Sequence, residues 1–173
     1  PVMRTDDVVR ANWSPNDGWT DPYGALMGLR KKVRSMGAKY VHGEVTGIEA
    51  NGGLVRAVLL ADGQRLAADT IVNNGGAWAH EFCQMVGFDI PVRPLHRPTF
   101  YFEPEQPMPK LPLTIDGAPC SYRQEGRGFI TGTTRFETAG EFRWEPDHSL
   151  FEETIWPRIA HRNPAFETIK LKN

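Results

Sequence analysis

The sequence predicts an α+β fold in which a half with helices and hairpins precedes a half of short antiparallel strands. Three observations support this prediction. A helical pattern covers residues 22–36, and short β-branched runs separated by tight turns follow it. From Pro91 onward, frequent prolines separate strand-like segments, which is typical of an antiparallel sheet. We therefore expect two domains, residues 1–90 and residues 91–173.

The first helix should begin at Pro22 and end at Met36. Asp21 is a favourable N-cap, and Pro22 occupies the first helical position, where its missing N–H costs nothing. Gly37 follows where a left-handed C-terminal cap is common. The apolar residues between these ends recur at helical spacing and make one stripe along the helix: Tyr23, Leu26, Met27 and Val33.

Hairpins and a second helix complete the first half. Asn51-Gly52-Gly53 and Asp62-Gly63 are typical hairpin turns. We expect a helix over 77–87, because its apolar residues fall on one face and Gly87 can cap it. The predicted strands cover residues 39–44, 45–50, 54–61 and 70–73.

A glycine-paired turn stands between the last of these strands and the second helix. Its sequence is Ile71-Val72-Asn73-Asn74-Gly75-Gly76-Ala77-Trp78. Glycines allow positive φ and close backbone approach, so a tight packing turn explains them. A ligand on the bare backbone is the alternative explanation, because N–H groups at a helix start attract anions. The chain contains no G-x-G-x-x-G and no P-loop, and both explanations stay open on these residues.

The second half should form a sheet covered by one helix. A helix is expected from Asp147 to Ala160, with Pro157 as a kink or break. Its inward residues should be Leu150, Ile155 and Ile159. The amphipathic run 166–173 resembles a further strand. The predicted strands of the sheet cover residues 99–102, 113–115, 120–123 and 128–132.

Composition excludes several classes of partner. A net charge of -1, with no basic cluster, argues against nucleic acid. No run approaches the roughly 18 apolar residues of a membrane span. Cys83 and Cys120 form no CxxC pair, so we expect two free thiols in a reducing compartment, and the five histidines lack the spacing of a metal site. We expect a cytoplasmic location and no bound metal.

No known catalytic motif stands out. The carboxylates are scattered, and no serine lies in a nucleophile elbow. On the predicted sheet, Tyr122, Arg123 and Arg135 are candidate substrate contacts, because arginines bind carboxylates in a bidentate manner. Solvent-exposed arginines are the alternative, and the catalytic residues stay unknown.

The order of these segments resembles the central part of a known family. The family comprises the FAD-dependent amine and amino-acid oxidoreductases related to D-amino-acid oxidase, which include sarcosine oxidase, dimethylglycine dehydrogenase and glycine oxidase. The resemblance lies in DGWTDPYGALMGLRKKVRSMGAKYVHGEVTGIE, the hairpins after it, and DTIVNNGGAWAHEFCQMVGFDIPVRP. The later YRQEGRGFITG and LFEETIWPRIAHRNPAFETIK are most similar to the FAD-dependent oxidoreductase domain-containing proteins, which are implicated in respiratory complex I assembly.

The resemblance implies a fold and a cofactor. Residues 1–90 would be an incomplete, Rossmann-like FAD-binding lobe without the N-terminal G-x-G-x-x-G unit, and residues 91–173 would be the substrate-binding antiparallel sheet. Val45 would offer its backbone to the FAD adenine. The turn would pack near the ribityl and flavin part of the cofactor, although the family's usual form is Ala-Gly or Ala-Ala-Gly. The turn residues implied to bind FAD are Asn74, Gly75, Gly76, Ala77 and Trp78.

The same resemblance implies an activity. We expect this chain to be a fragment of an enzyme that oxidises a C–N bond of an amine or amino acid, of the sarcosine, dimethylglycine or D-amino-acid type, by hydride transfer to the flavin. The fragment alone should be inactive, and its exposed surfaces should favour self-association. Two alternatives stay open: a non-catalytic assembly factor or scaffold with a flavoprotein fold, and a binding module without flavin.

Overall fold

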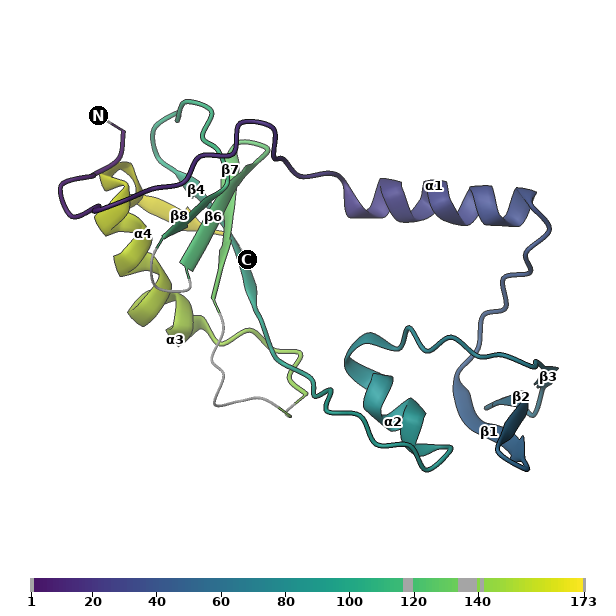
Figure 1. Ribbon diagram of the computed structural model, residues 1–173. Helices are drawn as coiled ribbons and strands as arrows, with labels where there is room; N and C mark the ends of the chain where they lie inside the picture. Colours follow the sequence, from purple (N-terminus) through teal and green to yellow (C-terminus); the bar gives the residue numbers. More distant parts are fainter. Residues whose placement is uncertain (1, 117–119, 134–139, 141, 173) are drawn as a thin grey trace. The chain divides into compact units, whose positions relative to one another are not determined.

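The computed structural model describes residues 2–116, 120–133, 140 and 142–172 (Figure 1). The chain divides into two compact units. The sheet unit combines Pro1–Asp17 with Pro94–Asn173, and the hairpin unit is Gly18–Arg93. The chain passes between the units twice, after Asp17 and after Arg93, and the second of these positions lies close to the expected boundary after residue 90. The first was not expected, because the sequence analysis placed residues 1–17 in the first domain. These residues are instead bonded to the sheet unit, as in the bond from the Arg4 N–H to the Arg162 carbonyl oxygen.

The hairpin unit begins with helix α1, Pro22–Ser35. The predicted start is confirmed, because the Asp21 carboxylate accepts a hydrogen bond from the Tyr23 N–H at 3.0 Å. Gly37 has a φ of +94°, so it provides the left-handed residue at the C-terminal end. The apolar stripe of α1 is not buried, since α1 has no buried residue.

Three antiparallel strands follow in the order β1-β2-β3. They are β1 Val45–Asn51, β2 Leu54–Leu60 and β3 Arg65–Ala67. The strands predicted over 39–44 and 70–73 are wrong, because a β-branched run forms a strand only where another strand pairs with it, and neither run has such a partner among the described residues. β3 was missed because it is short and contains no β-branched residue.

The second helix is shorter than predicted. A 3-10 turn, η1 Gly76–Trp78, leads into α2 Ala79–Gln84. Gly87, with a φ of +72°, lies beyond the helix end, as the sequence pattern indicated.

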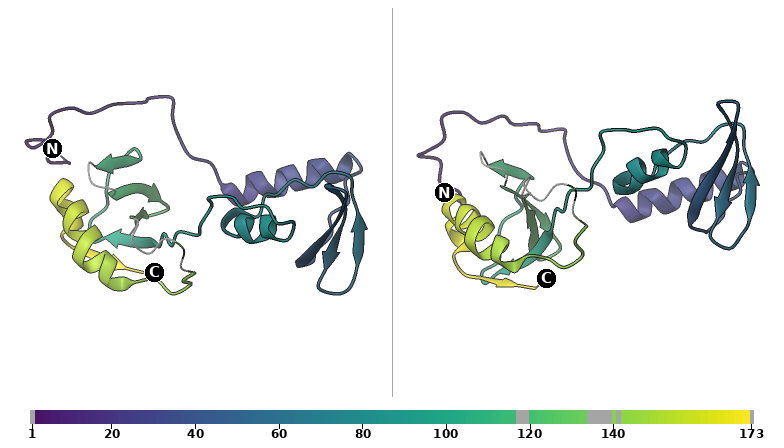
Figure 2. Two further views of the ribbon diagram at one scale, coloured as in Figure 1. Left: turned by 60° about the horizontal axis from the view of Figure 1, so that its bottom comes forward. Right: turned by 90° about the horizontal axis from the view of Figure 1, so that it is seen from below.

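The sheet unit contains a five-stranded antiparallel sheet in the order β5-β6-β7-β4-β8. Figure 2 shows the helices near the C-terminus lying beside this sheet. All four predicted strands are present, and the strand-like run near the end of the chain forms β8. The strands are β4 Thr99–Pro104, β5 Thr114–Asp116, β6 Cys120–Glu125, β7 Gly128–Gly132 and β8 Ile169–Leu171.

One continuous helical segment covers a face of this sheet. It consists of α3 His148–Leu150, the π-helical turn η3 Phe151–Ile155 and α4 Trp156–Arg162, and the 3-10 turn η4 Pro164–Phe166 follows. Pro157 does not break the helix. It lies in the first turn of α4, directly after the π-helical turn, where a missing N–H is tolerated.

The core lies between these helices and the sheet. The ring of Phe166 packs against the rings of Phe129, Phe102 and Tyr122, with centroid distances of 4.9, 5.0 and 5.3 Å. The predicted inward residues Leu150, Ile155 and Ile159 are confirmed as part of the same cluster. Among the residues that the structure describes, no helix is both long and apolar enough to cross a membrane.

Candidate functional site

The glycine-paired turn is organised by Asn73. Its amide Nδ2 donates to the Ala79 carbonyl oxygen at 2.8 Å and to Cys83 Sγ at 3.2 Å, and its Oδ1 accepts from the Gly75 N–H at 2.9 Å. One side chain therefore ties the turn to α2. Sequence reasoning missed this role, although an Asn two residues before a Gly is a known signal of an Asx-turn.

The two glycines serve different purposes. A Cβ on Gly75 would lie 3.0 Å from Asn73 Oδ1 and 3.2 Å from the Ala79 nitrogen, so tight packing favours Gly at this position. Gly76 has a φ of +56°, and a Cβ there would meet nothing within 4 Å. Gly75 therefore allows close packing within the turn, whereas Gly76 leaves the backbone accessible. The neighbouring side chains of Asn74 and Trp78 are exposed, and Ala77 is half-buried.

Val45 lies at the start of β1, where it pairs with Leu60. β1 is an edge strand, so its outer backbone has no partner strand in the part of the sheet that is described. Val45 and the turn lie on separate elements of the hairpin unit.

The sheet unit presents a second candidate surface. The face of the sheet opposite the helices, here called the open face, carries Tyr101, Ile130 and Arg123 in one cross-strand row, because Tyr101 pairs with Ile130 and Ile130 pairs with Arg123. All three residues are half-buried. The row combines an aromatic, an aliphatic and a cationic side chain.

Tyr122 does not belong to the open face, which corrects its expected role as a substrate contact. It is 1% exposed, its ring lies in the core, and its hydroxyl donates to Met3 Sδ at 3.6 Å. Successive residues of a strand point to opposite faces, so Tyr122 and Arg123 cannot contact the same ligand from this sheet. Burial raises the pKa of the Tyr122 phenol. The third expected contact, Arg135, lies outside the described residues.

Charged groups surround the cross-strand row. The Glu103 carboxylate accepts from the Tyr101 hydroxyl at 3.1 Å and pairs with Arg127 at 3.5 Å. Desolvation, and then the Glu103 carboxylate, raise the pKa of Tyr101 above its ordinary value. Arg123 pairs with Glu125 on the same strand. A ligand carboxylate that binds Arg123 must therefore compete with Glu125.

The two cysteines are free thiols, as expected, and they lie in different units. Cys120 is buried, and burial raises its pKa. Over the described ranges, no group of three or more His, Cys, Asp or Glu side chains is arranged to hold a metal ion.

Comparison with known proteins establishes the family. The family model described as "DAO: FAD dependent oxidoreductase" matches residues 1–172. The chain therefore belongs to this family of FAD-dependent oxidoreductases, as the resemblance in its sequence indicated. FAD is the cofactor of the family.

Curated relatives extend well beyond this chain. "FAD-dependent oxidoreductase domain-containing protein 1" of Xenopus laevis is 30% identical, over 99% of this chain and 42% of the relative. The human mitochondrial dimethylglycine dehydrogenase is 33% identical over 55% of this chain and 11% of its own length. The chain thus spans less than half the length of these relatives.

Solved structures confirm the fold. L-proline dehydrogenase from P. horikoshii matches with a TM-score of 0.81 at 22% identity, over 100% of this chain and 47% of that protein. Iminodiacetate oxidase from Chelativorans sp. BNC1 matches with a TM-score of 0.66 at 16% identity, over 87% of this chain and 41% of that protein. The mixture of helices and antiparallel sheets is therefore the fold of this family of flavoenzymes.

Two features of the hairpin unit are compatible with contacts to part of FAD. Gly76 leaves room for a flat group beside the backbone, since a Cβ there would meet no atom. The edge of β1 at Val45 offers backbone donors and acceptors of the kind that a purine base uses. The sequence contains no glycine fingerprint for the pyrophosphate.

Proposed function

We propose that the full-length protein oxidises a C–N bond of an amine or amino acid by hydride transfer to flavin. The observation that supports this proposal best is the open face with its row of Tyr101, Ile130 and Arg123. Such a row offers an apolar surface for the carbon skeleton and a guanidinium for a carboxylate. The proposal also agrees with the family of the chain.

The names of related proteins support the substrate class. Dimethylglycine, L-proline and iminodiacetate appear in the names of a sequence relative and of two structural relatives. Each of these compounds carries an amine next to a carboxylate. We propose that the substrate of this protein also carries an amine next to a carboxylate, and we do not select one compound of this class.

Each residue has a defined part in this proposal. FAD, when bound, supplies the hydride acceptor, and the protein supplies orientation and electrostatics. Arg123 would leave Glu125 and bind the substrate carboxylate. Ile130 would exclude water beside the amine carbon. The bare backbone at Gly76 would contact the cofactor.

The test uses the full-length protein under anaerobic conditions. Sarcosine, dimethylglycine, proline and D-amino acids are offered in turn, and flavin bleaching reports reduction. For the substrate that reduces the flavin, Arg123→Ala should raise KM about tenfold or more, because a hydrogen bond to a charged group contributes about 1.5–3 kcal/mol. Arg127→Ala is the matched control, since its side chain is 89% exposed. An unchanged KM in the Arg123 variant would remove Arg123 from the site.

A second candidate function is a flavoprotein-fold scaffold. It is favoured by α1, which carries apolar residues but buries none of them in the hairpin unit, as Leu26 and Leu29 show with exposures of 59% and 66%. Such a face suits a protein partner or a second copy of the isolated chain. Stable partner capture without flavin reduction by any amine would support the scaffold, and a mass by light scattering that rises with concentration would support self-association.

A further inference from the structure

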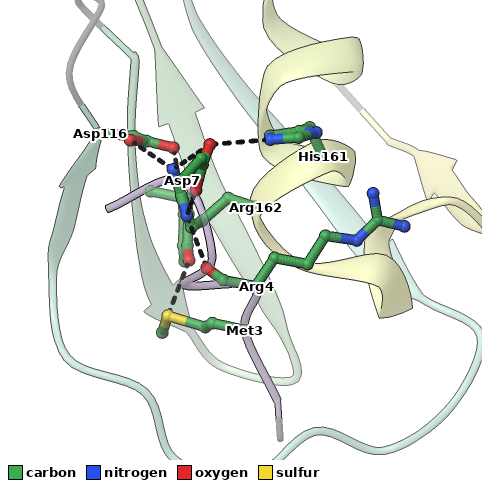
Figure 3. Close-up of polar contacts among 7 residues, drawn as sticks. Met3, Arg4, Asp7, Asp116, His161 and Arg162 are labelled. Atoms are coloured by element: carbon green, nitrogen blue, oxygen red, sulfur yellow. Dashed lines mark hydrogen bonds and ion pairs between the residues drawn. The ribbon is translucent and has the colours of Figure 1, made fainter. Parts of the chain in front are cut away.

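Arg162, the last residue of α4, contacts three residues from two segments of the sheet unit (Figure 3). Its Nε donates to Asp116 Oδ2 at 2.8 Å, and its Nη2 donates to Asp116 Oδ1 at 3.2 Å. Toward the N-terminal segment, Nη1 donates to Asp7 Oδ1 at 2.7 Å and Nη2 donates to Asp7 Oδ2 at 3.2 Å. Nη1 also donates to the carbonyl oxygen of Arg4.

These bonds use all the donors of the side chain. A guanidinium has five N–H groups, and the five contacts occupy each of them. The side chain is 9% exposed, so water competes little for these donors. The backbone adds a return bond, from the Arg4 N–H to the Arg162 carbonyl oxygen at 2.8 Å. We call Arg4, Asp7, Asp116 and Arg162 the clasp.

The groups around the clasp add weaker links. His161 Nε2 lies 3.0 Å from Asp7 Oδ2, and Arg4 pairs with Glu167 at 3.6 Å between exposed side chains. Met3 packs against the edge of the core and accepts the bond from the Tyr122 hydroxyl. Of residues 2–17, Met3 alone is half-buried, and the others are exposed. Polar bonds therefore hold this segment far more than burial does.

We propose that the clasp is a conformational lock, which holds residues 3–7 on the sheet unit and thereby fixes where the connection to the hairpin unit begins. The connection is residues 8–17, and its described backbone bonds are local, such as the one from the Asp17 N–H to the Ser14 carbonyl oxygen. Ten extended residues span at most about 35 Å, so this length bounds the connection while residues 3–7 are held on the sheet unit. The lock thus limits how far the connection formed by residues 8–17 can extend from the sheet unit.

Arginine is required by this geometry. A lysine in place of Arg162 would provide one ammonium group, which cannot donate to two carboxylates and a carbonyl in one plane. Arg162→Lys should therefore release the N-terminal segment while the core remains folded, because the core residues are contributed by the sheet and the helices. Arg158→Lys is the matched control, since Arg158 is an exposed residue of the same helix.

Hydrogen exchange of the whole chain measures the release. Arg162→Lys should speed exchange in residues 3–8 at least tenfold and leave β4 and β7 unchanged, whereas Arg158→Lys should change neither. Should Arg162→Lys fail to fold, Asp7→Asn provides the same test, because Arg162 keeps its bonds to Asp116. Asp6→Asn is then the isosteric control, since Asp6 is an exposed neighbour.

The charge of Asp7 provides an independent readout. Hydrogen bonds from Arg162, and then from His161, lower the pKa of Asp7 from 3.8 to about 2. The other charged groups at the clasp are Asp116 on β5 and the Arg4–Glu167 pair. A lowered pKa means that the stabilisation is fully present above pH 3.8 and is lost as the pH falls through about 2. The lock therefore stays closed at neutral pH.

The outcomes separate a lock from a general structural role. A lock requires that hydrogen exchange in Arg162→Lys becomes faster in residues 3–8 and not in β4 or β7. It also requires that the Asp7 carboxyl, followed by NMR, titrates nearer pH 3.8 in Arg162→Lys than in the unmodified chain. Two results would overturn the proposal. One is equal exchange of residues 3–8 in Asp7→Asn and Asp6→Asn. The other is exchange in β4 and β7 that rises together with the segment, because that shows global unfolding.

Discussion

Replacing Phe166 with Ala should remove a central contact of the sheet unit. Phe166 is 0% exposed, and its ring meets three other core rings at centroid distances of 4.9 to 5.3 Å. Loss of the buried ring costs about 2–3 kcal/mol in transfer free energy, and the cavity left among rigid rings adds to it. We therefore expect the free energy of unfolding to fall by about 4 kcal/mol. This is a large part of the roughly 5–15 kcal/mol of a typical domain.

The assay must report on the sheet unit alone, since the two units need not unfold together. Native-state hydrogen exchange of the β4 and β7 amides meets this requirement. Phe166→Leu should cost about 1.5 kcal/mol, because it retains most of the volume. Ile115→Ala, at a position that is 75% exposed on β5, should change stability by less than about 0.5 kcal/mol. A loss below about 1 kcal/mol for Phe166→Ala would refute the packing argument.

Three further predictions follow from local geometry. Gly128→Ala should destabilise the sheet unit by about 1–3 kcal/mol in urea denaturation, because its Cβ would clash with the Phe102 carbonyl oxygen on β4. Asn73→Ala should speed amide exchange in α2, because three hydrogen bonds are lost, whereas Asn74→Ala should leave it unchanged; equal effects would contradict the assigned role. Iodoacetamide should label Cys83 before Cys120 in the folded protein, as checked by mass spectrometry, because Cys120 is 2% exposed with a raised pKa.

Local chemistry predicted much of the sheet unit from the sequence. Turn residues and prolines marked the ends of its strands, and hydrophobic spacing identified the helix that carries Ile155 and Ile159. The same logic failed for residues 39–44 and 70–73, where β-branched side chains occur without a partner strand among the described residues. Strand formation depends on pairing, and a local pattern contains no information about the partner.

Contacts between distant residues account for the other differences. Asp7 and Arg162 are separated by 155 positions, and nothing in the local sequence around Asp7 indicates that it joins the sheet unit. The alternation of strand residues could have separated Tyr122 from Arg123, because neighbours in a strand point to opposite faces. The position of Asn73 before a pair of glycines could also have predicted its role in the turn. No pattern in the sequence indicated the role of Arg162.

The two arginines show why structure is needed to separate binding from stability. In sequence, Arg123 and Arg162 are alike: each is a cation close to apolar residues. In the structure, Arg162 commits all five donors to other residues of the sheet unit, so recruiting it to a ligand would release the N-terminal segment. The Arg123 side chain lies 27% exposed on the open face, and its carboxylate partner Glu125 is two residues away on the same strand. Exchange of Glu125 for a substrate carboxylate would leave that strand pairing intact, which is consistent with the proposed role of Arg123 in binding the substrate.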